Sequence, residues 1–423
     1  MRRTPAAVSR SPASLTSPEP DGLADRRRLT ANLAAVGLLV ALGAGVLAWQ
    51  QPWRASDSTG RDTMPADARA EVVRQFQRMS AAHSRAAFVK AVGSSGEARA
   101  TGRHIWDARH VLRIEHVRYS YTRGGEAIDR ADGTTSAEAK VSWRGGASDV
   151  RFRLRPRPDG FDVISASNAG RRPLPVWLAG EISVSRAAEV TVMTVDGGNR
   201  EIDAAKLAGV GAAQVKRLVP TAEADLTVVV PRRVSTTAAL LGRRPSQVAQ
   251  VAATSTELGG RNGKPAIVLN PTVFASMDAR ARQIVMTHEA THALTGIVGH
   301  TVDPWVAEGF ADYVALHDDR ASLAVSAGQI LRKVKAGGPP KVLPSAKDFN
   351  ESAHGLGAAY EAAWMAFRML GAQFGDAALR DFYTDVVAGT SVDAAAQRRF
   401  GLTVDQLTAE WRSYLTKSAS TVS

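Results

Sequence analysis

The sequence lacks cysteine altogether and has few aromatic residues. With Cys 0 among 423 residues, the chain has no disulfide scaffold, no iron–sulfur cluster, no thiolate zinc finger and no cysteine nucleophile. Any metal site must therefore use histidine and carboxylate ligands. The 44% of hydrophobic residues excludes disorder along the whole chain, and the length indicates two or three domains.

Acidic residues are outnumbered, since 53 Lys+Arg against 41 Asp+Glu give a formal charge of +12. Four of the arginines recur with a period of two: Arg151, Arg153, Arg155 and Arg157. A strand would place these guanidinium groups on one face, with Phe152 and Leu154 pointing inward. Two readings remain open, a solvated sheet face or contact with anionic lipid or a wall polymer. An exported domain that has no basic groove interleaved with aromatic residues is predicted to have no nucleic-acid partner.

One long apolar run precedes the rest of the chain. Residues 31–49 contain no charge, and at about 1.5 Å per residue such a run spans the roughly 30 Å hydrocarbon layer of a bilayer. Six arginines precede it, which predicts a cytoplasmic N-terminus. The predicted parts are a cytoplasmic tail (1–29), a transmembrane anchor (30–50), a linker (51–66) and an extracytoplasmic remainder. The alternative is a signal peptide whose cleavage releases a secreted protein.

Residues 67–180 are predicted to form a small accessory α+β domain. Apolar positions near helical spacing predict one helix over about 67–88, and alternating stretches predict strands at 111–122, 138–143 and 161–166. This order resembles nuclear-transport-factor-like cone domains, which implies a helix packed on a curved antiparallel sheet. No catalytic constellation occurs in this part.

Beyond residue 185 the pattern changes to alternating strands and helices. Strands are predicted at 189–195, 225–230 and 265–270, and helices at 204–218 and 236–241. A longer helix is predicted to begin near Met277 or Asp278, with Asp278 as its N-cap.

That longer helix contains His288-Glu289-Ala290-Thr291-His292, an HExxH pattern. Residues four apart share a helix face, so both imidazoles can bind one zinc ion at about 2.0 to 2.1 Å. Glu289 beside them is placed to act as a general base toward water.

A suitable third ligand follows in the segment Trp305-Val306-Ala307-Glu308-Gly309. A loop over 296–304 and a second, antiparallel helix would present Glu308 to the metal. Asp312 lies one helical turn later on the same face, where it could accept the N–H of a ligand histidine.

The segments HEATHAL and PWVAEGFADYVA resemble the gluzincin branch of zinc metallopeptidases, in particular thermolysin-fold domains related to membrane alanyl aminopeptidases. The resemblance covers about residues 186–416. It implies a peptidase domain over 186–417 with a mainly helical C-terminal half, one Zn²⁺ per chain held by His288, His292 and Glu308, and Glu289 as general base. Tyr360, which opens YEAAWMAFRMLGAQFG, corresponds to the segment that supplies a catalytic tyrosine in relatives.

Two departures limit the resemblance. The GxMEN strand of aminopeptidase relatives is absent where KPAIVLN (264–270) stands, which argues against exopeptidase action. The strand within this segment is predicted to be the sheet edge that pairs with an extended substrate. His300 is out of register for a metzincin third ligand and is interpreted as a loop histidine.

The sequence thus predicts a membrane-anchored, extracytoplasmic α+β protein that cleaves peptide bonds as a zinc-dependent endopeptidase, through a zinc-activated water. Its partners would be a peptide or protein substrate and the membrane. Tyr360 or His354 would stabilise the oxyanion, although Tyr360 could equally be a core aromatic residue. The alternative function is a non-catalytic cell-surface binding protein with a peptidase-like domain.

Overall fold

The computed structural model describes residues 62–125, 131–258, 263–349 and 355–422. The predicted cytoplasmic tail and transmembrane anchor, most of the linker, and His354 lie outside these residues. Within the described ranges, no helix has the length and apolar character needed to cross a bilayer.

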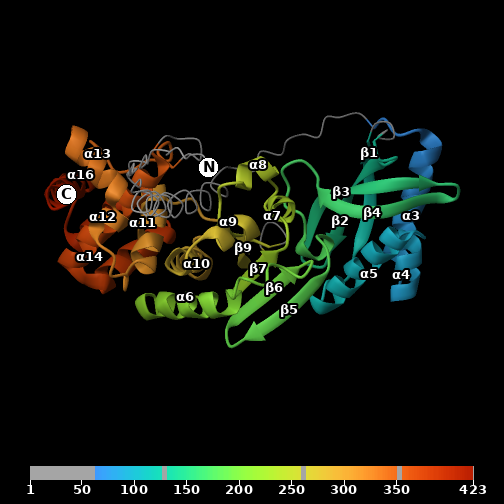
Figure 1. The fold of residues 1–423 in the computed structure, drawn as a ribbon, viewed down its shortest axis with the longest axis horizontal. Helices are drawn as coiled ribbons and strands as arrows, with labels where there is room; N and C mark the ends of the chain where they lie inside the picture. The colour runs from blue at the N-terminus through green and yellow to red at the C-terminus, as the bar shows by residue number, and fades with distance from the viewer. Residues whose placement is uncertain (1–61, 126–130, 259–262, 350–354, 423) are drawn as a thin grey trace, which may run out of the picture.

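The first described unit is an α+β domain at one end of the molecule (Figure 1). Three helices precede a four-stranded antiparallel sheet of order β1-β2-β3-β4. Apolar side chains of the helices, the sheet and a following 3-10 turn share one hydrophobic cluster. The elements are α3 (Ala66–Ala81), α4 (Arg85–Val92), α5 (Gly96–Val111), β1 (Arg118–Gly124), β2 (Thr135–Trp143), β3 (Gly146–Arg157), β4 (Gly160–Asn168) and η1 (Val176–Leu178).

The single helix predicted before this sheet is wrong, because three helices occupy that part of the chain. The backbone becomes extended at Ala82, and the Ser84 side chain then caps a new helix by accepting from Ala87 N. Ser95 caps α5 in the same way. Val111 is the last residue of α5, so the strand predicted from that position begins only at Arg118. At both positions a serine N-cap starts a new helix after the chain has left helical geometry.

The alternating arginines lie on strand β3, with Phe152 and Leu154 buried as predicted. Every one of the four has a carboxylate partner among the described residues: Arg151 with Glu138, Arg153 with Asp132, Arg155 with Glu97, and Arg157 with Asp159 and Asp162. These pairs neutralise the face, which favours the interpretation as a solvated sheet surface. Contact with anionic lipid or a wall polymer stays a prediction.

A five-stranded sheet of order β5-β6-β7-β9-β8 forms the middle of the molecule. Its central pairs, β6 with β7 and β7 with β9, are parallel, whereas the pairs at both edges are antiparallel. The strands are β5 (Ile182–Ala187), β6 (Val190–Val195), β7 (Leu226–Pro231), β8 (Ala253–Glu257) and β9 (Pro265–Leu269). The intervening helices are α6 (Ala204–Leu218), α7 (Val234–Leu240), α8 (Pro245–Val248) and α9 (Pro271–Ser276).

The predicted substrate-pairing edge at 265–270 is wrong. Strand β9 lies between β7 and β8, and β8 forms the edge. All of β9 from Ala266 to Leu269 is buried, as expected of a strand with neighbours on both sides and helices over the sheet.

The C-terminal half is helical, and it packs on the sheet around the largest hydrophobic cluster of the described residues. In Figure 1 these helices gather at the end of the molecule opposite the first domain. They are α10 (Ala279–Leu294), α11 (Pro304–Ala315), α12 (Leu323–Ser326), α13 (Gly328–Gly337), α14 (Leu356–Val387), α15 (Val392–Phe400) and α16 (Val404–Ser420). The arrangement is α+β with a mainly helical C-terminal half, as the sequence predicts.

Candidate metal centre

Helix α10 carries His288, Glu289 and His292 through the interior of the protein. Asp278 caps its first turn by accepting from Ala281 N at 2.7 Å, as predicted. From Ile284 to Leu294 every residue is buried, because the sheet, α6 and α11 surround the helix. A helix buried on all sides normally has an apolar surface. The three ionisable side chains at its centre therefore need partners within the protein.

Helix α11 provides the facing acidic residues. The helix starts with Pro304 at its first turn, and it places Glu308 and Asp312 one turn apart, both buried against α10. Gly309 is required for this packing, since a Cβ there would lie 2.6 Å from the Phe367 ring and 2.8 Å from the Ala363 carbonyl oxygen. The glycine after Glu308 thus lets α11 approach α14 closely.

Three side-chain atoms from the two helices converge. His288 Nε2 lies 3.0 Å from His292 Nε2 and 3.1 Å from Glu308 Oε2. His292 Nε2 lies 3.6 Å from the same Glu308 oxygen. Ligand atoms held about 2.0 to 2.1 Å from one ion at tetrahedral angles lie roughly 3.3 Å apart. The donor types and their spacing fit a zinc ion.

The charge of this cluster also fits a bound cation. The side chains of Glu289, Glu308 and Asp312 are all buried there, and none of the buried residues in the described ranges is a lysine or arginine. Burial alone would lower the pKa of His288, but the carboxylates of Asp312 and Glu308 raise it well above its usual range. Buried carboxylates without a basic partner favour a positive ion among them.

Asp312 orients the first histidine. Its Oδ1 lies 2.8 Å from His288 Nδ1, and both groups are buried. An ionised Asp312 accepts from Nδ1–H, which fixes the tautomer that leaves Nε2 as a lone-pair donor. The structure therefore places Asp312 where the sequence predicts a supporting carboxylate.

Glu289 is held by the edge strand of the sheet. Its Oε2 accepts from the backbone N of Ser255 on β8 at 2.7 Å, and Ser255 Oγ lies 2.7 Å from the same oxygen and 2.8 Å from the Glu289 carbonyl oxygen. Its Oε1 is buried and has no hydrogen-bond partner within the described part of the chain. One carboxylate oxygen is thus fixed, and the other is left to accept a proton.

Ser255, which contacts Glu289, is a site residue that the sequence does not predict. It lies 34 residues before Glu289, within a short polar strand that carries no recognisable motif. Residues 253–257 read ATSTE, which has no apolar–polar alternation, so the sequence does not separate a strand from a loop here.

Tyr360 lies next to the cluster at the start of α14. It is fully buried, with its ring centroid 6.4 Å from that of His288 and 5.0 Å from that of Phe349 in an edge-on contact. This position suits either a catalytic or a packing role. His300 is exposed and lies outside the group of potential metal ligands.

Comparisons with known proteins find matches of low sequence identity among solved structures. No protein-family model matches it, and no curated protein does. The M1 zinc metallopeptidase of Deinococcus radiodurans matches 66% of this chain and 60% of its own, at 13% identity and a TM-score of 0.36. A mutant of that peptidase bound to a Tyr-Ser-Ala substrate matches 66% of this chain and 61% of its own, at 13% identity and a TM-score of 0.33.

A two-domain M1 zinc metallopeptidase mutant bound to L-arginine matches 68% of this chain and 61% of its own, at 12% identity and a TM-score of 0.34. The chain thus spans about 60% of the length of these peptidase structures. Within the described residues, the buried side chains of His288, His292 and Glu308 form a group that could hold one metal ion.

Proposed function

We propose that this chain is a zinc-dependent peptidase. The observation that carries the proposal is the buried convergence of His288 Nε2, His292 Nε2 and Glu308 Oε2, whose mutual distances lie between 3.0 and 3.6 Å. A zinc ion held by these atoms would polarise a scissile carbonyl group and acidify water.

The side chains around the ligands support hydrolysis rather than binding alone. Glu289 presents Oε1, which has no hydrogen bond from the described residues, while Ser255 fixes Oε2. A carboxylate held in this way can take the proton of an attacking water and pass it to the leaving amine. Asp312 holds the His288 ring during these steps. Tyr360 would donate to the developing oxyanion.

Strand β8 supports an extended peptide as substrate. It is an edge strand of the sheet, and Ser255 within it contacts Glu289. A peptide added along β8 would pair with edge groups other than the Ser255 N–H, which already donates to Glu289, and such pairing needs no free terminus. Together with the absence of a GxMEN segment, this favours endopeptidase action.

A non-catalytic binding protein is the second candidate function. Such a protein could retain His288, His292 and Glu308 for structural zinc, but it would have no use for Glu289. Burying that additional carboxylate is costly unless its charge has a role.

Metal analysis and a peptide-library digest of the full chain test the proposal together. We expect about one zinc per chain, lost in His288→Ala, His292→Ala and Glu308→Ala, because each change removes one of three protein ligands. Glu289→Gln should keep the zinc and lower turnover roughly a hundredfold to ten-thousandfold, since only the base is lost.

The exposed Glu223→Gln is the matched control and should behave as wild type. Full zinc occupancy with no cleavage by the unmodified chain would support the binding protein instead. Full occupancy in Glu308→Ala would show that the third ligand is a different residue.

We further propose that residues 31–49 anchor the peptidase in the membrane, with its catalytic domain outside the cytoplasm. The support is the uncharged run and the arginines before it. The full chain should sediment with membranes, and protease added to intact cells should degrade its bulk. A soluble product that begins near Trp49 would instead indicate a cleaved signal peptide.

A further inference from the structure

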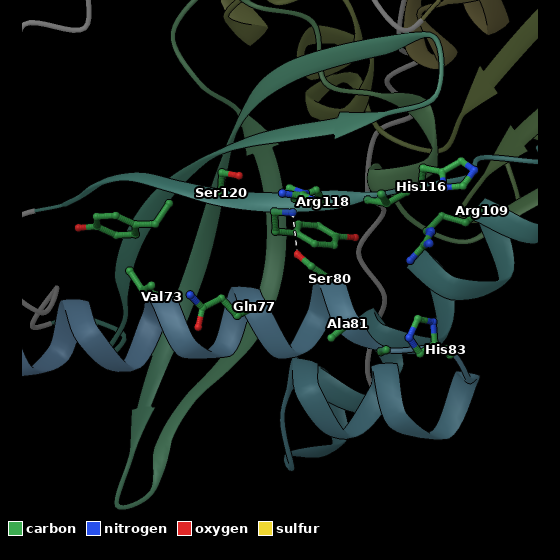
Figure 2. Close-up of a pocket in the computed structure, with 13 residues that line it drawn as sticks. Val73, Gln77, Ser80, Ala81, His83, Arg109, His116, Arg118 and Ser120 are labelled. Atoms are coloured by element: carbon green, nitrogen blue, oxygen red, sulfur yellow. Dashed lines mark hydrogen bonds between the residues drawn. The ribbon is translucent and has the colours of Figure 1, made fainter.

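A groove opens in the N-terminal α+β domain, away from the metal centre. It has a volume of about 760 Å³ and lies among α3, the α3–α4 connection, α5 and the first strand β1. This volume is within the range of pockets that hold small organic molecules. None of the thirteen residues drawn along it in Figure 2 carries a carboxylate.

Cationic and hydrogen-bonding side chains gather at one end of the groove. Figure 2 shows Arg109, His83 and His116 there, contributed by three different segments. His116 Nε2 lies 2.6 Å from Arg144 Nη2. Because arginine only donates, Nε2 is the acceptor, and the Nδ1–H of the neutral ring remains a donor.

Arg109 is rigidly held but has no acidic partner. Its guanidinium lies over the rings of Phe88 and Trp106, at 5.6 and 5.5 Å from their centroids. It forms no ion pair with a carboxylate of the described residues, and its buried Nε has no hydrogen-bond partner among them. Asp107, on the same helix, is paired with Arg85. An arginine stacked in this way is preorganised to bind an oxyanion.

The other end of the groove has a different character. Figure 2 places Val73 and Gln77 on α3 there, away from Arg109. The ring of Tyr121 also lines the groove, and its hydroxyl lies 3.0 Å from both carboxylate oxygens of Asp62, which disfavours a second anionic group at this end. This end suits an apolar or weakly polar group, so the groove as a whole matches an elongated molecule with one charged end.

Addition of a peptide strand to β1 is disfavoured. The outward-facing N–H of Tyr119 already donates to Ser80 Oγ on α3 at 2.9 Å. An added strand needs such N–H groups free for its own carbonyl oxygens, and it would have to displace α3 to reach this one.

We propose that this groove binds a small organic anion, with its carboxylate or phosphate-monoester group at Arg109 and its apolar body between α3 and β1. The site is separate from the metal centre and does not depend on the proposed peptidase activity.

Titration calorimetry on the full chain tests the proposal with defined probes. The carboxylate probe is 4-phenylbutyrate, its neutral match is 4-phenylbutanamide, and the phosphate probe is phenyl phosphate. We expect at least one anionic probe to bind, and the amide to bind roughly tenfold or more weakly, because it cannot form charge-assisted hydrogen bonds. The stronger anionic probe identifies the head group.

The Arg109→Gln variant should lower the affinity for the anionic probe by a similar factor. Arg103→Gln, which removes an equal charge from an exposed position of the same helix, should leave the affinity unchanged. Matching melting temperatures of the two variants confirm that the domain remains folded. Equal binding by acid and amide, wild-type affinity in Arg109→Gln, or no binding by either anionic probe would overturn the proposal. Binding of an extended peptide, with hydrogen-exchange protection of β1, would also overturn it.

Discussion

Ser255 binds Glu289 twice, through its backbone N and its Oγ, each 2.7 Å from the same carboxylate oxygen. Both residues are buried, and they join the edge strand β8 to the helix that carries the HExxH pattern. The pair determines how the proposed general base is oriented, because the oxygen that Ser255 does not hold has no hydrogen bond from the described residues.

Replacing Ser255 by alanine should lower kcat roughly tenfold and leave KM and zinc content nearly unchanged. The change removes one hydrogen bond to a charged group and keeps the backbone bond. Steady-state kinetics with metal analysis check this result. Thr254→Val is the matched control, since the Thr254 hydroxyl lies buried on the same strand without a hydrogen-bond partner in the described ranges. An unchanged kcat in metallated Ser255→Ala would assign Ser255 a purely structural role.

Asp312→Asn should weaken zinc binding roughly tenfold to a hundredfold. The asparagine keeps an oxygen near His288 Nδ1 but removes the negative charge that strengthens the ligand and fixes its tautomer. Competition with a coloured chelator measures the affinity. Asp318→Asn, which alters a surface pair with Arg217, should have no effect. If Asp312→Asn binds zinc as tightly as wild type, Asp312 does not support the metal site.

Local patterns predicted the metal centre because its parts lie on two short, consecutive segments. The i, i+4 spacing places His288 and His292 together on one helix face, and the turn between Glu308 and Asp312 does the same on the next helix. The loop between these helices, residues 295–303, lets α11 fold back and pack directly on α10. The buried convergence of the three ligand atoms follows from these constraints.

The remaining contacts depend on tertiary structure. Strand β8 has only five residues, with polar side chains that also suit a loop, so neither the edge nor Ser255 could be predicted. For β9 a usable signal was present, since its unbroken run of apolar residues indicates a strand covered on both faces. Helix α5 escaped prediction because its apolar positions are few and are separated by charged residues. Helix α4 is short and mostly apolar, and its Phe88 was assigned to the single predicted helix.

Glu361 should make the protein less stable as the pH rises from about 5 to about 8. Its carboxyl lies in the interior and accepts from Ile330 N at 2.7 Å. Burial, helped by Asp312, raises its pKa from 4.5 to about 8, although backbone hydrogen bonds and Arg332 oppose the rise. Between these pH values the unfolded chain loses the proton that the folded chain keeps, so the free energy of unfolding falls, on the order of a few kcal/mol.

Glu361→Gln should remove much of this pH dependence, because the amide retains an acceptor for Ile330 N and does not ionise. Urea unfolding of the zinc-loaded protein at the two pH values measures the difference. Glu223→Gln, at an exposed position, should retain the wild-type slope. A wild-type slope in Glu361→Gln would show that other groups cause the loss of stability.

The Tyr360→Phe variant distinguishes a catalytic role of Tyr360, which lies beside His288, from a packing role. If the hydroxyl donates to the oxyanion only as charge develops, kcat should fall roughly a hundredfold with little change in KM, because one such donor contributes about 2.7 to 4 kcal/mol to the transition state. Phenylalanine keeps the ring and its edge-on contact with Phe349, so a packing role predicts near-normal turnover and at most a modest loss of stability. Zinc content must be measured in the same sample, because metal loss would imitate a catalytic defect. Near-normal kcat in the fully metallated variant would remove Tyr360 from the mechanism and make His354 the next residue to test.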